Sequence, residues 1–155
     1  MQAIIDLPWT SPPLSMNDRG ASRGAAFAKA AMIRDIREYI VKQARTHCLP
    51  RLIDHVEVQL NYRPRDNRRR DTDNLVATLK PICDALTVGK PARISPRTGR
   101  PVPAQPGCGL VFDDTPEYMS KPEPRIWPAI KGHQYGRLWV TLTWTPADQR
   151  TDNAA

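Results

Sequence analysis

Residues 56–86 read VEVQLNYRPRDNRRRDTDNLVATLKPICDAL, and this stretch contains a predicted strand, a charged turn and a predicted helix. Apolar and polar side chains alternate from Val56 to Tyr62, which is the period of a half-buried strand. From about Thr72 to Leu86 the apolar residues recur at helical spacing, so one face of this helix is expected to pack on a sheet. The charged turn therefore connects a strand to a helix.

The turn joins three arginines to two carboxylates, in the order Arg68, Arg69, Arg70, Asp71 and Asp73. Guanidinium groups hold phosphate in a planar, two-pronged grip. Carboxylates repel phosphate unless a hard cation lies between them, and Mg²⁺ binds oxygen ligands while keeping places for phosphate oxygens. The turn therefore suggests metal-assisted phosphodiester cleavage. The alternative is a solvated turn whose charges compensate each other, which is the usual fate of a charge run.

The predicted helix presents charged residues on the face opposite to its apolar one. Asp73, Lys80 and Asp84 share that face, because steps of seven and eleven residues nearly complete whole turns. Asp71 or Thr72 is expected to cap the first turn, whose partial positive charge favours carboxylates and phosphate alike. The helix is therefore expected to direct two carboxylates and an ammonium group outward.

The overall composition bounds the class of protein. The chain has 155 residues, of which 40% are hydrophobic and 6% aromatic, with 16 prolines, which indicates one domain with a modest core and long connections. A net charge of +7 and a pI near 9.7 favour a polyanionic partner, nucleic acid first. No membrane span or signal peptide is evident, and three cysteines without Cys-x-x-Cys spacing favour a reducing compartment. We expect a cytoplasmic protein without membrane contact.

Outside the central stretch, periodicity predicts further regular elements. Strands are expected at 3–7 and 138–144, and a long helix at about 25–48. Arg34, Arg37 and Arg45 lie largely off the apolar stripe of that helix, so they are expected on a solvated face, with DNA contact as the less favoured alternative. These elements predict an α+β fold in which a small mixed sheet packs against two main helices.

The remaining segments lack a clear period. Residues 88–109 form a basic, Pro/Gly-rich stretch that is expected to be a loop, either contacting DNA or tolerated as an insertion. The predicted domain covers residues 1–146, and the tail 147–155 is expected to be frayed. In the N-terminal loop, Asn17 and Arg19 either touch a sugar-phosphate backbone or are a turn residue and a solvated charge.

A second acidic site follows an apolar run late in the chain. Asp113 and Asp114 are adjacent, and adjacent carboxylates raise each other's pKa unless something positive separates them. A metal ion would provide that separation, and so would solvent. Asp114 and Asp113 are therefore candidate metal ligands.

Three motifs together carry a family resemblance. RRDTDNL at residues 69–75, DAL at 84–86 and FDD at 112–114 resemble the RusA-type Holliday junction resolvases of phages, prophages and bacteria. The loop around residues 9–17 is also similar, and the order of elements agrees over roughly residues 4–145. The resemblance implies a homodimeric endonuclease that requires Mg²⁺, with Mn²⁺ as a substitute, and cuts paired strands symmetrically at four-way DNA junctions.

The resemblance also implies roles for individual residues. Asp71, Asp73 and Asp114 would bind the metal, with Asp113 as the alternative to Asp114, and Lys80 would assist catalysis. Arg69 and Arg70 would hold DNA phosphates beside Arg68. The segment between the first two motifs is about one helical turn longer than the family pattern, which moves Lys80 further along the helix. A nuclease for forks or flaps, and a non-catalytic nucleic-acid-binding protein, remain alternatives.

Overall fold

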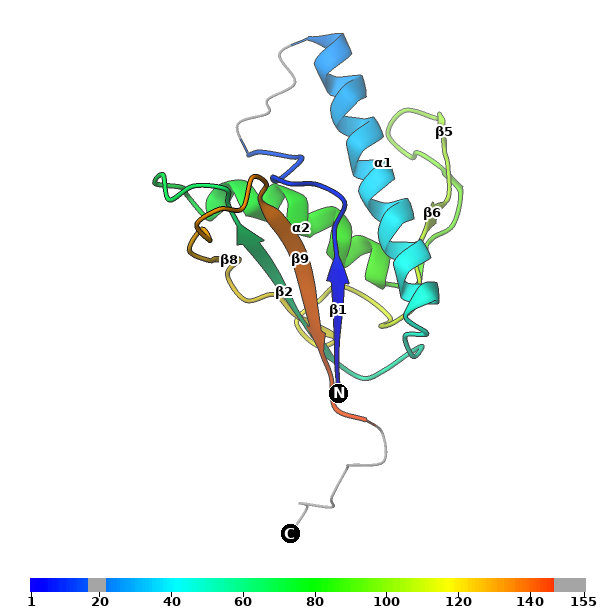
Figure 1. The fold of residues 1–155 in the computed structure, drawn as a ribbon. Coiled ribbons are helices and arrows are strands. Elements are labelled where there is room, and N and C mark those ends of the chain that lie inside the picture. Colours follow the sequence, from blue (N-terminus) through cyan, green and yellow to red (C-terminus); the bar gives the residue numbers. More distant parts are fainter. Residues whose placement is uncertain (17–21, 147–155) are drawn as a thin grey trace.

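The computed structural model describes residues 1–16 and 22–146, which form a mixed sheet with two helices on one face (Figure 1). The strands follow the order β1-β9-β2-β7, and β8 also pairs with β2. β9 runs antiparallel to both β1 and β2, whereas β7 and β8 run parallel to β2. The elements are β1 Gln2–Asp6, α1 Arg23–Thr46, β2 Val56–Arg63, α2 Asp73–Leu86, β7 Met119–Ser120, β8 Arg125–Ile126 and β9 Arg137–Thr143.

The predicted α+β class is confirmed, and the core lies between the sheet and the helices. Alternate residues of β2 and β9 point toward α1 and α2, as the two-residue period requires. These side chains and the apolar stripes of both helices are almost completely buried: Val58, Leu60, Leu138, Val140, Ile36, Ile40, Leu75 and Ile82. Within the described ranges, neither helix combines the length and apolarity that crossing a bilayer requires.

The other face of the sheet carries a stack of arginine and tryptophan side chains. In Figure 1 the strands lie in front of α2, so this face is turned away from that helix. The Trp127 and Trp139 rings are 6.1 Å apart, and the Arg63 guanidinium lies 5.6 Å from the Trp139 ring. Arg125 and Arg137 lie 5.3 Å and 4.8 Å from the Trp127 and Trp139 rings, respectively. Cation–π contacts therefore cover Trp139, which is only 8% exposed.

The expectation of a solvated face is wrong for Arg37 of α1. Its side chain is buried where α1 packs against α2. The Nη1 atom lies 3.4 Å from both an Asp84 carboxylate oxygen and the Gln105 amide oxygen. Helical periodicity identifies the apolar stripe but not a neighbouring helix that brings its own carboxylate, so the burial of Arg37 depends on tertiary packing.

Within the stretch 88–109, which was expected to be a loop, the structure adds short regular pairings. Two pairs of short antiparallel strands form there, which we name the arm (residues 89–106). Its strands have only two residues each, so its prolines need not interrupt a long ladder. The pairs are β3 Gly89–Lys90 with β6 Gln105–Pro106, and β4 Arg93–Ile94 with β5 Pro101–Val102.

The root of the arm is attached to the C-terminal end of α2. The N–H groups of Cys108, Gly109 and Val111 donate to the carbonyls of residues 85, 87 and 86, at 2.8, 2.9 and 3.2 Å. These bonds satisfy backbone acceptors that a helix end leaves without intrahelical partners. Gly107 fits because a Cβ there would lie 2.0 Å from the Thr87 carbonyl oxygen. The arm therefore begins from a fixed point on α2.

Candidate functional site

The arginine turn lies between β2 and α2 and is organised by Asp66. Arg70 Nη2 lies 2.6 Å from an Asp66 carboxylate oxygen, and Nη1 donates to the carbonyls of Asp66 and Arg68 at 2.8 and 2.9 Å. The hydrogen bond from Arg70 holds the pKa of Asp66 below its ordinary value. Arg70 therefore fixes the turn, while the exposed side chains of Arg68 and Arg69 face solvent, where phosphate can reach them.

The first two predicted ligands lie at the start of α2. Asp71 and Asp73 are both exposed, and an Asp71 carboxylate oxygen accepts from the backbone N–H of Asp73 at 3.3 Å. Thr72 is the residue before the helix, but its side chain makes no capping bond, so capping by its hydroxyl is not observed. That hydroxyl instead donates to a carboxylate oxygen of Glu123 at 2.6 Å. The sequence predicted that Asp71 or Thr72 would cap the first turn of α2, and the side chain of Asp71 makes this contact.

A shallow hollow of about 490 Å³ lies beside these acids. Arg69 and Asp71 contribute opposite charges to it, and the Ser15 hydroxyl donates to the Asn74 side chain at 2.9 Å on its wall. The other lining residues are Pro12, Leu14, Tyr62, Arg70, Leu75 and Ile126. The hollow therefore combines the guanidinium group of Arg69, a type of group that can bind phosphate, with the carboxylate of Asp71, a type of group that can bind a cation.

Lys80 links two carboxylates further along the exposed face of α2. Its Nζ atom lies 2.8 Å from Asp84 Oδ1 and 2.6 Å from Asp114 Oδ2, and Lys121 Nζ lies 3.2 Å from the same Asp114 atom. Partial burial alone would lower the pKa of Lys80, but the hydrogen bonds to Asp114 and Asp84 outweigh it and raise that pKa. The hydrogen bond from Lys80 lowers the pKa of Asp114 to about 2. Lys80 and Asp114 are therefore both charged near neutral pH.

The adjacent acids Asp113 and Asp114 have different roles. An Asp113 carboxylate oxygen accepts from the backbone N–H of Asp114 at 2.8 Å, whereas the Asp114 carboxylate faces Lys80 and Lys121. The lysines provide the positive charge that two neighbouring carboxylates need. Of the two candidates, Asp114 is the one placed with the charged residues of α2.

The three carboxylates proposed as ligands do not form one group. Among residues 1–16 and 22–146, no three or more His, Cys, Asp or Glu side chains lie where they could hold a single metal ion. Asp71 and Asp73 lie at the start of α2, whereas Asp114 is bound to Lys80, and seven helical residues correspond to a rise of about 10 Å. The structure therefore separates the two acids at the start of α2 from Asp114.

The donor chemistry at the start of α2 fits magnesium. Mg²⁺ is commonly bound by only one or two carboxylates, with water and substrate phosphate completing its octahedron. Asp71 and Asp73 form one such pair, whereas Asp84 and Asp114 already have the Lys80 ammonium group between them. The predicted DNA contacts Asn17 and Arg19 lie outside the described residues.

The sequence analysis did not identify two charged residues that lie beside α2, Lys121 and Glu123. Lys121 binds Asp114, and Glu123 binds Thr72, so residues 121–123 pass beside α2. No motif or period marks them, because they lie in a Pro-rich segment between short strands. Asp84 was recognised on the charged face through its spacing of eleven residues from Asp73. We name this set the α2 face: Asp71, Asp73, Lys80, Asp84, Asp114, Lys121 and Glu123.

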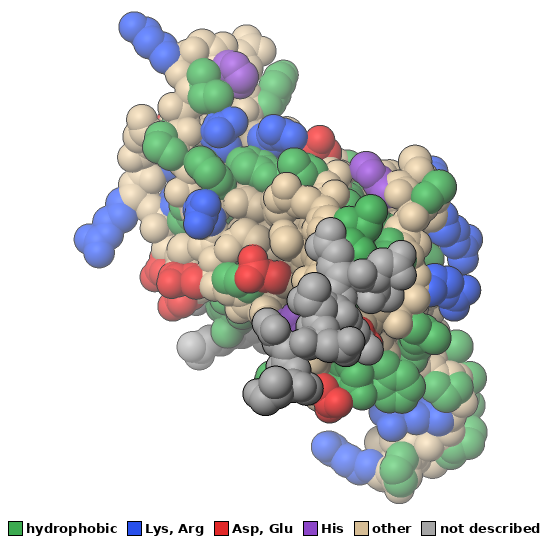
Figure 2. All heavy atoms as spheres, turned by 90° about the horizontal axis from the view of Figure 1, so that it is seen from below, with side chains coloured by type: hydrophobic (Ala, Val, Ile, Leu, Met, Phe, Trp, Pro, Cys, Tyr) green, Lys and Arg blue, Asp and Glu red, His purple; other side chains and the backbone are tan. Residues whose placement is uncertain are grey.

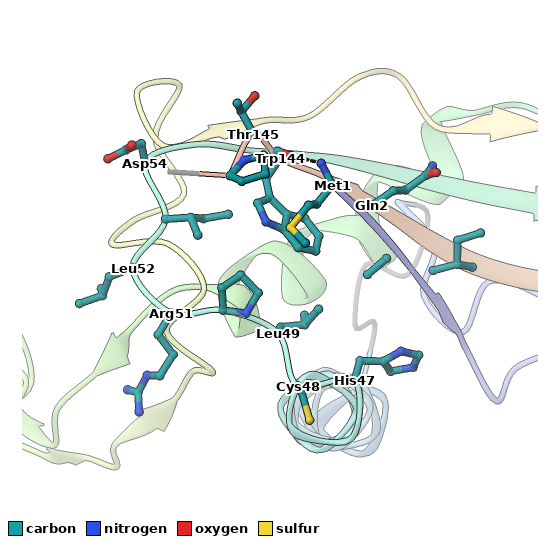
Figure 3. A pocket seen from close by; sticks show the side chains of 15 residues that line it. Met1, Gln2, His47, Cys48, Leu49, Arg51, Leu52, Asp54, Trp144 and Thr145 are labelled. Atoms are coloured by element: carbon teal, nitrogen blue, oxygen red, sulfur yellow. Dashed lines mark hydrogen bonds between the residues drawn. The ribbon is translucent and has the colours of Figure 1, made fainter. Parts of the chain in front are cut away.

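A hollow larger than the one beside Asp71 lies elsewhere. It has a volume of about 950 Å³ and is lined by Met1, His47, Cys48, Leu49 and Trp144, among others (Figure 3). Its walls include Gln2, which pairs with Thr143 at one end of the sheet, whereas the arginine turn follows Arg63 at the opposite end. Viewed from below, visible Lys and Arg side chains lie mainly around the rim of the molecule (Figure 2). This hollow therefore lies apart from the candidate site at the arginine turn and α2.

The chain matches no protein-family model, and no curated protein matches its sequence. A function therefore has to be inferred from the positions and chemistry of the side chains described above.

The Lys80–Asp114 ion pair predicts an acid-dependent loss of stability. The folded-state pKa of Asp114 is about 2, below its ordinary 3.8, so its contribution is present above about pH 4 and is lost as the pH falls toward 2. Asp114→Asn is expected to lower the free energy of unfolding at neutral pH and to flatten its pH dependence between 4 and 2. Urea unfolding at several pH values measures this dependence.

The matched control for this experiment is Asp113→Asn, which removes the neighbouring carboxylate and leaves both lysine contacts of Asp114 in place. If Asp114→Asn kept the wild-type slope in this window, the ion pair would not exist in solution.

Proposed function

We propose that this protein is a Mg²⁺-dependent, structure-specific DNA endonuclease that resolves four-way junctions by paired, symmetric strand cleavage in recombination and repair. The observation that most supports this proposal is the arrangement of α2. An arginine turn leads into a helix whose exposed face carries Asp71 and Asp73 at its start and the Asp84–Lys80–Asp114 group further along. Positively and negatively charged side chains therefore alternate along one surface.

DNA affinity in this proposal comes from the backbone rather than the bases. Arg68 and Arg69 would contact phosphates, and the net charge of +7 would favour approach to a polyanion. Such contacts position a protein on DNA without reading sequence, and they weaken as salt rises. Preference for a junction would then come from the shape of the complex.

Carboxylates of the α2 face would hold the metal ion. Asp71 and Asp73 are the proposed ligands at the start of α2. Asp114, with Asp113 as the weaker alternative, would contribute its carboxylate from the separate group around Lys80, because no three acids of the described residues lie where they could hold a single ion. A bound Mg²⁺ ion would polarise a phosphate oxygen of DNA and lower the pKa of a bound water molecule. The carboxylates would balance the charge of the ion and hold it beside the DNA backbone.

Lys80 acts as a fixed positive charge in this proposal. Its pKa is raised, so it does not accept a proton from water near neutral pH. It would instead stabilise negative charge that develops on the phosphate during cleavage. Its contacts with Asp84 and Asp114 hold the ammonium group on the exposed side of α2.

Paired cleavage requires two sites with related orientations. A two-fold symmetric homodimer provides them, because each subunit presents the same surface to an equivalent strand. We therefore propose a homodimer that acts on DNA in the bacterial cytoplasm.

Competition between substrates tests this proposal. Wild-type protein is incubated with a labelled immobile four-way junction in Mg²⁺ or EDTA, with an excess of unlabelled junction, replication fork or linear duplex. We expect cleavage only with Mg²⁺, and only the unlabelled junction should suppress it efficiently. Stronger suppression by the fork would favour the alternative nuclease for other branched DNA. Binding without cleavage under every condition would favour a non-catalytic DNA-binding protein.

A further inference from the structure

The arm carries a concentration of positive charge that the proposed cleavage site does not use. Residues 88–109 contain four cationic residues and no Asp or Glu. All four cationic side chains are exposed, and none takes part in an ion pair within residues 1–16 and 22–146: Lys90, Arg93, Arg97 and Arg100. Clustered like charges repel each other, so an anionic partner would relieve this repulsion.

The arm also has a defined shape. Its two strand pairs form a ribbon, and the end of the ribbon is closed by hydrogen bonds from Ser95 N–H to the Arg100 carbonyl at 2.9 Å and from Gly99 N–H to the Ser95 carbonyl at 2.8 Å. Gly99 has a φ of 64°, a left-handed conformation that glycine adopts without a steric penalty. The arm is therefore a preformed ribbon.

The root of the arm lies next to the Lys80 end of the α2 face. Arg37 Nη1 contacts Gln105 of the arm and Asp84 of α2 at the same distance, 3.4 Å. The arginine turn lies at the other end of α2, and Figure 1 shows the arm and this turn on opposite sides of the molecule. α2 has 14 residues, which gives a length of about 21 Å between the two basic features.

We propose that the arm is a second DNA-binding element, which holds the duplex flanking the cleavage site while the arginine turn holds the opposite flank. This inference rests on the proposed function, since it assumes branched DNA as the partner. A two-stranded ribbon fits the major groove, which is about 12 Å wide. The exposed guanidinium groups would contact phosphates on the walls of that groove, so the contact would be independent of base sequence.

Neutralising the arm tests the inference. The triple variant Arg93→Gln, Arg97→Gln, Arg100→Gln is compared with a control that removes three exposed charges from α1. Binding to a labelled four-way junction and to linear duplex is measured in EDTA over a series of salt concentrations. Each lost phosphate contact reduces the salt slope by about 0.9, so we expect the arm variant to lose about 2 to 3. The control substitutions are Arg34→Gln, Lys42→Gln and Arg45→Gln.

Hydroxyl-radical footprinting locates the contact. The arm variant should lose protection at one edge of the wild-type footprint and keep it at the centre of the junction, whereas the control should keep both. Equal affinities and salt slopes for the two variants would overturn the inference. A loss of affinity with an unchanged footprint would also overturn it, because it would be a general charge effect.

The outcomes separate this inference from the proposed function. If wild-type protein never cuts DNA in Mg²⁺ but the arm variant loses the flanking contact, the nuclease proposal fails and the arm remains a DNA-binding element. If the protein cuts junctions and the arm variant binds like the control, only the inference about the arm fails. If wild-type protein binds no DNA, both fail.

Discussion

Asp73→Asn is expected to reduce junction cleavage by on the order of a hundredfold or more while leaving junction binding unchanged or tighter. Bound metal supplies several kcal/mol of transition-state stabilisation, and each 1.4 kcal/mol corresponds to about tenfold in rate. Asparagine is nearly the same size as aspartate but carries no charge, so it binds Mg²⁺ poorly and repels phosphate less. Single-turnover cleavage and binding in EDTA measure the two effects separately.

Asp35→Asn is the matched control, because it removes one exposed carboxylate from α1 instead of α2. It should cut at the wild-type rate. If Asp73→Asn also cut normally in Mg²⁺, Asp73 would not be a metal ligand and the start of α2 would lose its proposed role.

Lys80→Met is expected to reduce the cleavage rate by about a hundredfold with little change in DNA affinity. Removing a group that stabilises charge in a transition state typically costs 10²–10³ in rate. The substitution also leaves Asp84 and Asp114 without the ammonium group that lies 2.8 Å and 2.6 Å from them. We therefore expect a lower melting temperature as well, measured by thermal unfolding.

Lys80→Arg separates the chemical role of Lys80 from its structural role. Arginine keeps the positive charge, so it should restore most of the stability, but its planar group has a different geometry. We expect cleavage to remain clearly below wild type. The pKa of Lys80 is raised, so Lys80 should not change its charge between pH 7 and 9. The cleavage rates of wild type and Lys80→Arg should therefore depend on pH in the same way over this range. A Lys80→Met variant that cut at the wild-type rate would exclude Lys80 from catalysis.

Periodicity predicted the elements that contribute most to the core. The two-residue alternation in β2 and β9 and the helical spacing of Leu75, Leu79 and Ile82 all correspond to buried faces in the structure. Because each of these elements buries one face, its apolar residues recur with the period of that element, and this period can be read from the local sequence. The charged face of α2 was also predicted from helical spacing. In the structure, Lys80 and Asp84, which are four residues apart on this face, form an ion pair.

Contacts between distant segments were not predictable in this way. Lys121 approaches Asp114, and Glu123 approaches Thr72, only because β7 and the residues after it follow the edge of β2. Arg37 is buried because α2 supplies Asp84 as its partner. The arm was missed because two-residue strands contain no measurable period, and its prolines suggested irregular structure instead.

The most direct test of the central claim is to map cuts on all four strands of an immobile junction, with and without Mg²⁺. We predict paired cuts at symmetry-related positions on two opposed strands in Mg²⁺, and intact strands in EDTA. Intact strands under both conditions, or cuts that occur equally without a divalent metal, would contradict the assignment of the α2 face as a metal-dependent cleavage site.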